Sequence, residues 1–180
     1  MKQLPSAWAE APLSSLLAEP LANGRSVPDG EGFPVLRLSA LREDAIDFSE
    51  RKLGSWSNAE AEPFLVKGGD LLVARGNGSL RLVGRARLVP SNPPEVAFPD
   101  TMIRVRPKAG FVDPRFLAIQ WEAPRTRSQV ERAARTTAGI YKVSQGDLRE
   151  LQMVVPPLDE QHRIVAAIET HFSRLDAAVA

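Results

Sequence analysis

A glycine-rich stretch flanked by arginines is the segment whose residue types first suggest chemistry. Between positions 74 and 81 the chain carries two arginines, two glycines and two small polar residues, namely Arg75, Gly76, Asn77, Gly78, Ser79 and Arg81. The glycines permit positive φ angles and a close approach of the backbone to a ligand. The amide and hydroxyl can hydrogen bond to a phosphate or a base edge, and arginine suits bidentate recognition of phosphate or guanine. The stretch predicts a DNA-binding turn, although an ordinary hairpin turn would use the same residues.

The same glycines match neither common nucleotide-binding motif. A Walker A loop ends in lysine followed by serine or threonine, and no such pair closes this stretch. Against the dinucleotide fingerprint, the third glycine is misplaced, and a strand rather than a helix is predicted to follow. We therefore expect no nucleotide cofactor.

A second basic segment, residues 125–142, follows later in the chain. We expect a helix over 127–139, closed by Gly139, with Ser128, Arg132 and Arg135 on one face. The residues assigned to a DNA-facing surface are Arg135, Thr136, Thr137, Tyr141 and Lys142. Arginines, hydroxyls and an aromatic ring on a loop after a basic helix can contact phosphates and base edges. A solvated basic helix without a ligand is the alternative interpretation.

Nothing in the sequence singles out a catalytic or metal-binding group. Cysteine is absent, which excludes a thiolate nucleophile and a disulfide framework. His162 and His171 are nine residues apart on a predicted helix and face opposite sides, so they cannot share a metal ion. The Asn-Pro-Pro-Glu stretch at 92–95 has glutamate where the similar motif of amino methyltransferases has an aromatic residue. Acidic pairs such as Glu43 with Asp47 fit a solvated surface. We expect no cofactor, no metal site and no catalytic residue.

The distribution of charge is more informative than the net charge of +1. Residues 75–142 contain 13 basic and 5 acidic residues, a net charge of +8, and the rest of the chain contains 10 basic and 17 acidic residues, a net charge of −7. The basic residues of the middle are mostly arginines. This asymmetry favours a nucleic-acid partner, although nucleotide composition could also enrich arginine over lysine.

Strands and helices are predicted to follow one another irregularly. Hydrophobic residues make up 43% of the chain and charged residues 25%, which is typical of a globular domain. Short helices are predicted over 12–19, 113–123 and 144–151. Strands are predicted at 33–41 paired with 43–50, at 71–73 paired with 80–83, at 101–107 with one exposed face, and at 151–155. This order lacks βαβ regularity and predicts an α+β fold. No window is apolar for long enough to predict a membrane span.

Two prolines, Pro156 and Pro157, separate the last predicted strand from a helical tail. Proline cannot donate to a strand ladder, and the acidic residues that follow favour the positive end of a helix dipole. Apolar residues then recur at steps of three or four, at Ile164, Ile168, Phe172, Leu175 and Val179. Such a seam requires a partner helix, unless the helix packs back onto its own domain.

Three segments resemble the specificity subunit of type I restriction-modification systems. They are Leu-Pro-Ser-Ala-Trp at 4–8, Gly-Asp-Leu-Leu-Val-Ala-Arg-Gly-Asn-Gly-Ser at 69–79, and the run over 136–169 that contains Pro-Pro-Leu-Asp-Glu-Gln. The family typically shows the last pattern with a basic residue and Ile-Val just after it, as here. The intervening stretches, roughly 20–65 and 85–125, match no family pattern, and variation there would let such domains read different DNA.

The resemblance implies a non-catalytic, cytoplasmic target recognition domain over 1–155 and the start of a spacer helix over 156–180. In the family, two such domains each read one half of a split DNA site. Antiparallel helices separate the domains and dock the methyltransferase subunits. The implied partners are duplex DNA, the methyltransferase subunit and, through the complex, the restriction subunit, with no membrane.

The tail helix leaves the assembly state open. Its pairing residues would be Ile164, Ile168, Phe172 and Leu175. A chain of this length is either a half-size subunit that pairs with itself or a fragment. The alternative from another functional class is a protein-interaction module that docks a methyltransferase or another partner without touching DNA.

Overall fold

A four-stranded antiparallel sheet lies at the centre of the computed structural model, which describes residues 4–179. Its strands stand in the order β2 (Ala22–Asn23), β8 (Met102–Val105), β5 (Leu71–Ala74) and β7 (Ala86–Leu88). The two middle strands are buried along their whole length. Because successive side chains of a strand point to opposite faces, β5 and β8 contribute to two separate apolar cores.

Helices α2 (Pro114–Glu122) and α3 (Pro124–Ala133) pack over the core on one face of this sheet. Leu71 and Val73 of β5 enter this core together with Trp121 of α2. The indole N–H of Trp121 donates to the carbonyl oxygen of Gly84 at 2.8 Å, so this buried polar group is satisfied. Asp113 caps α2, as the predicted helix start at 113 requires.

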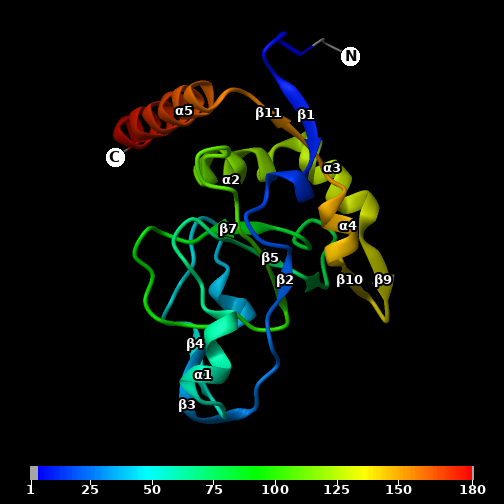
Figure 1. The fold of residues 1–180 in the computed structure, drawn as a ribbon, viewed down its shortest axis with the longest axis vertical. Helices are drawn as coiled ribbons and strands as arrows, with labels where there is room; N and C mark the ends of the chain where they lie inside the picture. The colour runs from blue at the N-terminus through cyan, green and yellow to red at the C-terminus, as the bar shows by residue number, and fades with distance from the viewer. Residues whose placement is uncertain (1–3, 180) are drawn as a thin grey trace.

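A smaller lobe from the N-terminal third packs on the other face. It contains β3 (Asp29–Leu36), β4 (Arg51–Gly54) and the short helix α1 (Asn58–Ala61). Leu72 and Met102 of the central sheet belong to the core on this side. In Figure 1 this lobe lies at the bottom, in blue and cyan.

The remaining strands tie the chain ends and the two basic segments together. They are β1 (Ala9–Pro12), which pairs with β11 (Gln152–Val155), and β6 (Gly76–Asn77), β10 (Ile140–Lys142) and β9 (Arg135–Thr137), which form a second sheet. The shorter helical pieces are α4 (Gln145–Arg149) and 3-10 turns at Leu13–Leu16, Leu38–Ala40 and Glu62–Phe64.

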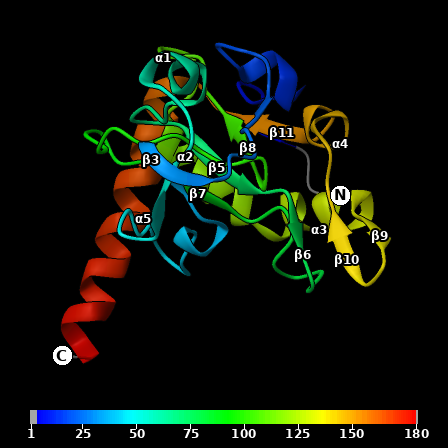
Figure 2. The same ribbon diagram turned by 90° about the horizontal axis from the view of Figure 1, so that it is seen from below.

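The long helix α5 (Leu158–Val179) follows β11, and its C-terminal end extends beyond the rest of the molecule (Figures 1 and 2). A mixed α and β body followed by one long helix confirms the predicted α+β class. The helices predicted at 113–123 and 144–151 and the strand predicted at 151–155 are also confirmed, within two residues at most ends.

Several predicted pairings were wrong. β5 pairs with β7 and β8, not with residues 80–83, which form turns. The partner of β3 is β4 at 51–54, not residues 43–50. Strand partners are chosen by burial of whole faces, and local sequence does not report this. The helix predicted over 12–19 is only the 3-10 turn Leu13–Leu16, preceded by β1.

The strand predicted with one exposed face, β8, is buried on both faces. Its Arg104 is 7% exposed. The guanidinium pairs with the carboxylate of Glu19 at 2.8 Å and lies 5.5 Å from the ring centre of Phe98. A charge with an ionic partner and an aromatic face beside it can be buried, so alternation of apolar and basic residues did not indicate solvent exposure here.

Candidate nucleic-acid interface

The second sheet brings together the two basic segments, residues 74–81 and 125–142, which lie far apart in the sequence. β10 lies between β6 and β9, with Tyr141 opposite Asn77 and Lys142 opposite Gly76. On its other side Lys142 is opposite Arg135. Figure 2 shows β6 beside β10, with β9 completing the edge of the molecule. Residues about 65 positions apart in the sequence therefore share one small surface.

Alternation along β10 divides this sheet into two faces. Tyr141 points to the core side, where its half-buried ring packs against the main apolar core. Ile140 and Lys142 point to the opposite, exposed face. A Cβ at Gly76 would lie 3.5 Å from Cγ of Lys142 and 3.7 Å from Cγ2 of Ile140, so both side chains flank this glycine. The exposed face is thus made of basic and apolar side chains over a residue without a side chain.

The helix predicted over 127–139 ends six residues earlier than expected. Helix α3 ends at Ala133, and Arg135 begins strand β9 instead of sharing a helical face with Ser128. Gly139 does not close a helix. It and Ala138, at φ angles of 76° and 50°, form the two-residue turn between β9 and β10. Two successive left-handed residues are typical of a type I′ turn, whose twist matches that of the flanking strands.

The glycine-rich stretch is held by local hydrogen bonds. The side-chain oxygen of Asn77 accepts the N–H of Ser79 at 2.9 Å, and the guanidinium of Arg75 donates to the carbonyl oxygen of Asp100 at 3.3 Å. Neither Gly76 nor Gly78 adopts a positive φ angle, so this turn does not use the left-handed conformations that glycine permits. Gly78 has open space around its Cα.

The predicted contact residues differ in exposure. Arg81, Arg135, Thr136, Gly78 and Lys142 are exposed, whereas Arg75, Gly76, Asn77, Ser79 and Tyr141 are half-buried. The side chain of Thr137 lies outside the described part of the structure. Ile140 was not among the residues predicted from the sequence, because it becomes part of this surface only once 135–142 folds as a hairpin.

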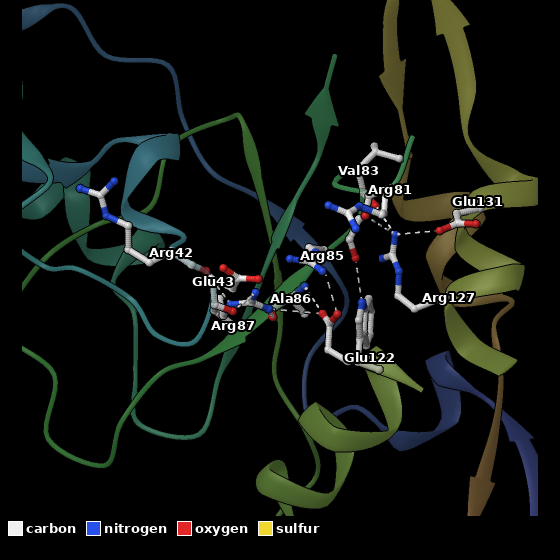
Figure 3. Close-up of polar contacts among 12 residues, drawn as sticks. Arg42, Glu43, Arg81, Val83, Arg85, Ala86, Arg87, Glu122, Arg127 and Glu131 are labelled. Carbon is white, nitrogen blue, oxygen red and sulfur yellow. Dashed lines mark hydrogen bonds and ion pairs between the residues drawn. The ribbon is translucent and has the colours of Figure 1, made fainter. Parts of the chain in front are cut away.

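Much of the positive charge of residues 75–142 is used inside the molecule. Figure 3 shows Arg85 and Arg87 beside the carboxylate of Glu122, at 3.9 and 3.3 Å. Arg87 also donates to the carbonyl oxygens of Arg42, at 2.7 Å, and Glu43, which fastens that loop to β7. These arginines are structural ties, and the high arginine content of the segment overstates what a ligand could reach.

Arg127 of α3 is similarly engaged. Its guanidinium donates to the carbonyl oxygen of Val83 at 2.9 Å and lies 3.7 Å from the carboxylate of Glu131 (Figure 3). Burial of the guanidinium lowers the pKa of Arg127. The side chain therefore secures the turn before β7 to α3.

The aspartate of the Gly-Asp-Leu-Leu stretch, Asp70, has a structural partner as well. Its two carboxylate oxygens accept from Nε and Nη2 of Arg106 at 2.7 and 2.8 Å, and one also accepts the N–H of Lys67. Arg106 also pairs with Glu19 at 2.7 Å. Hydrogen bonding to Asp70 raises the pKa of Arg106, and the hydrogen bond from Arg106 lowers the pKa of Glu19.

Two of the basic side chains that remain exposed lie on the second sheet, and two more lie in segments that adjoin its strands in sequence. Within the described residues of 75–142, the exposed basic residues without an ion pair are Arg81, Lys108, Arg132, Arg135 and Lys142. Arg135 and Lys142 lie on β9 and β10, Arg132 lies at the end of α3 just before β9, and Arg81 lies in the turn that follows β6. We call this sheet with residues 75–81 and 132–142 the basic face. Neutralising phosphates is the function to which such a surface is suited.

The joint between body and tail helix is held by the two family-like motifs at opposite ends of the chain. The indole N–H of Trp8 donates to the carboxylate of Glu160 at 3.0 Å, and β1 pairs with β11 just before the prolines. Gln161 is fully buried. Its amide oxygen accepts the N–H of Asp113 at 2.9 Å, and its NH₂ donates to the carbonyl oxygens of Phe111 and Pro156 at 3.2 and 2.9 Å.

The apolar seam of α5 is only partly covered. Ile164 and Ile168 are half-buried, whereas Phe172 is 61% and Leu175 48% exposed. Val165, which sequence reasoning did not place on the seam, is buried. An open apolar groove of about 990 Å³ separates this helix from α2 and β7, and Ile168 and Phe172 line it. The first half of the helix thus packs on the body, and the second half leaves large apolar side chains in solvent. The side chain of Val179 lies outside the described part.

No group of three or more potential metal ligands occurs among the described side chains. His162 lies 3.5 Å from the carboxylate of Asp113 on α2's cap, and His171 lines the apolar groove. In the part of the chain that the structure describes, no helix has the length and apolar character needed to span a membrane.

Comparisons with known proteins point to one class, the specificity subunits of type I restriction enzymes. The HsdS subunit from Thermoanaerobacter tengcongensis has a similar fold, with a TM-score of 0.70 at 19% identity over 98% of this chain and 45% of that chain. No model of a known protein family matches the chain.

Two curated relatives support the same class in sequence. The specificity subunit of the type I restriction enzyme EcoKI from Escherichia coli (strain K12) is 30% identical over 175 residues, which are 95% of this chain and 37% of that subunit. The StySPI specificity subunit from Salmonella potsdam is 30% identical over 173 residues, 94% of this chain and 37% of the relative. The chain is thus a homologue of these subunits and spans 37% of their length.

Proposed function

We propose that this chain is a DNA-reading domain of a type I specificity subunit, which recognises one half of a split duplex site and has no catalytic activity of its own. Homology over almost the whole chain supports the class. The observation that carries the DNA-binding role is the basic face, where Arg135 and Lys142 lie opposite each other on a three-stranded sheet and the exposed Arg81 lies in the turn that follows β6. We place residues 1–155 in the reading domain and 156–180 in a spacer that docks the methyltransferase subunit, in the cytoplasm.

Binding to a pool of random duplex DNA, followed by sequencing of the retained molecules, tests the reading role directly. We expect a short enriched motif and an affinity that falls as salt rises. The triple variant Arg81→Gln, Arg135→Gln, Lys142→Gln should bind more weakly and flatten the slope of log K against log salt by about 2.7, because each lost phosphate contact removes about 0.9.

The matched control removes the same charge elsewhere. Lys67, Arg163 and Arg174 are exposed and lie outside the basic face, and their replacement by glutamine should leave the salt slope unchanged. Equal losses for both triple variants would reject the basic face as the DNA surface. No enrichment by the unchanged chain, alone or with a methyltransferase subunit, would favour the interaction module that does not touch DNA.

We further propose that Ile164, Ile168, Phe172 and Leu175 pair with a second helix, which in this chain alone would be α5 of another copy. The exposed fractions of Phe172 and Leu175 support this, since large apolar side chains on an unpartnered helix favour association. Phe172→Glu should convert a dimer to a monomer in light scattering. Thr170→Glu adds the same charge at an exposed position that lies about 200° around the helix axis from Phe172. This control variant should remain a dimer. A monomeric unchanged chain would contradict self-pairing.

A further inference from the structure

One apolar side chain stands among the basic residues of the basic face. Ile140 is 44% exposed, although a branched aliphatic residue is normally buried. It follows the Ala138–Gly139 turn directly and lies on the same face as Lys142, beside Gly76. Neither the phosphate contacts proposed above nor the core explains an isoleucine at this position.

Ile140 lies next to the tip of the β9–β10 hairpin. β9 and β10 form a hairpin that lies at the edge of the body in both views (Figures 1 and 2). The third strand, β6, pairs only with Tyr141 and Lys142, so the end of the hairpin beyond them is two-stranded. Its tip carries only alanine and glycine, so little side-chain bulk precedes Ile140. The major groove of B-DNA admits a two-stranded ribbon of this kind. Arg135 and Lys142, paired across the ribbon, are placed to contact phosphates while the tip enters the groove.

The chemistry of the groove limits what an aliphatic side chain can read there. Donors and acceptors of the base edges require polar partners, and the apolar group displayed in the major groove is the C5-methyl of thymine. Resting on the function proposed above, we propose that Ile140 is a specificity-determining residue that contacts a thymine methyl group in the recognised half-site. The basic residues supply affinity independent of sequence, and Ile140 supplies discrimination at one base pair.

Thymine-to-deoxyuridine substitution isolates this contact, because it removes one methyl group and leaves base pairing intact. Each thymine of the selected duplex is replaced in turn, and affinity is measured for the unchanged chain and for Ile140→Ala. At one position the unchanged chain should lose about three- to fivefold in affinity, the value of one buried methyl group. Ile140→Ala should bind the thymine duplex correspondingly more weakly and show no thymine-to-uracil difference there.

Two further variants keep the result interpretable. Ile140→Thr retains β-branching and strand propensity with less apolar surface, so it should also lose discrimination while folding normally by circular dichroism. Lys142→Gln should weaken binding to both duplexes equally and keep the thymine-to-uracil ratio.

Each remaining outcome overturns the inference. An undiminished ratio in Ile140→Ala would remove Ile140 from the base contact. Uniformly weaker binding of that variant to all duplexes, with no methyl dependence, would assign Ile140 to a wedge in the minor groove. Unchanged DNA binding with loss of methyltransferase association would assign it to a protein contact. A chain that binds no duplex at all would instead reject the proposed function itself, and the inference with it.

Discussion

Asp70→Ala is expected to lower the free energy of unfolding by about 3–5 kcal/mol, because it breaks a buried ion pair by removing one partner. Asp70 is 1% exposed and accepts two hydrogen bonds from Arg106 and one from the N–H of Lys67. Without it, the largely buried guanidinium of Arg106 retains only Glu19, whose side chain is half exposed to solvent. Urea unfolding followed by tryptophan fluorescence measures the change.

Asp29→Ala provides the control for this variant. Asp29 also pairs with a cation, Lys52 at 2.6 Å, but its side chain is exposed, so its replacement should destabilise the fold far less than that of Asp70. A loss at Asp70 as small as at Asp29 would show that Glu19 compensates for the missing carboxylate. The expected result would give Asp70 a structural role, in which its ion pair with Arg106 holds the start of β5 beside the end of β8.

Gln161→Ala is expected to cost about 2–3 kcal/mol and to loosen the direction of α5. The amide of Gln161 satisfies the N–H of Asp113 and the carbonyl oxygens of Phe111 and Pro156, and a buried backbone group left without a partner costs about 1–3 kcal/mol. Gln161 lies on the tail helix, and its partners Asp113 and Phe111 belong to the body. Loss of these hydrogen bonds therefore releases the joint as well as destabilising the fold.

Two labels on cysteines introduced at Ser91 and Ser173 can measure the direction of the helix. The chain has no cysteine of its own, so the two sites are labelled uniquely. We expect a narrow distribution of label distances in the unchanged chain and a broader one in Gln161→Ala. His162→Ala is the control, because His162 follows Gln161 in the sequence but has an exposed side chain. This variant should keep the narrow distribution of label distances. An equally narrow distribution in Gln161→Ala would mean that packing of Val165 and Ile164 alone sets the direction.

Features that depend on short stretches of sequence were predicted well. The tail helix is encoded by two prolines, acidic residues in its first turn and apolar residues three or four apart, all acting within a few turns. Helix α2 begins at its Asp113 cap for the same reason. The family resemblance rests on the Pro-Pro-Leu-Asp-Glu-Gln run and the Gly-Asp-Leu-Leu stretch, which are likewise read without knowing the fold.

The hairpin at 135–142 shows where local reasoning failed. Residues 127–139 have a helical pattern, yet the helix ends at Ala133 because β10 pairs with β6. That pairing depends on a strand about 65 residues earlier in the chain. Tertiary pairing overrode helix propensity, and the Ala-Gly pair was therefore interpreted as a helix end when it is a turn.

By itself, then, the sequence determined the α+β class, the tail helix and the resemblance to type I specificity subunits, because each depends on residues close together in the chain. Only the tertiary structure decided which arginines a ligand can reach. Arg87, Arg104 and Arg106 are engaged by partners 35 to 87 residues away, while Arg135 and Lys142 lie opposite each other on one exposed sheet. Charge along a sequence can be counted, but its exposure depends on partners brought near by folding.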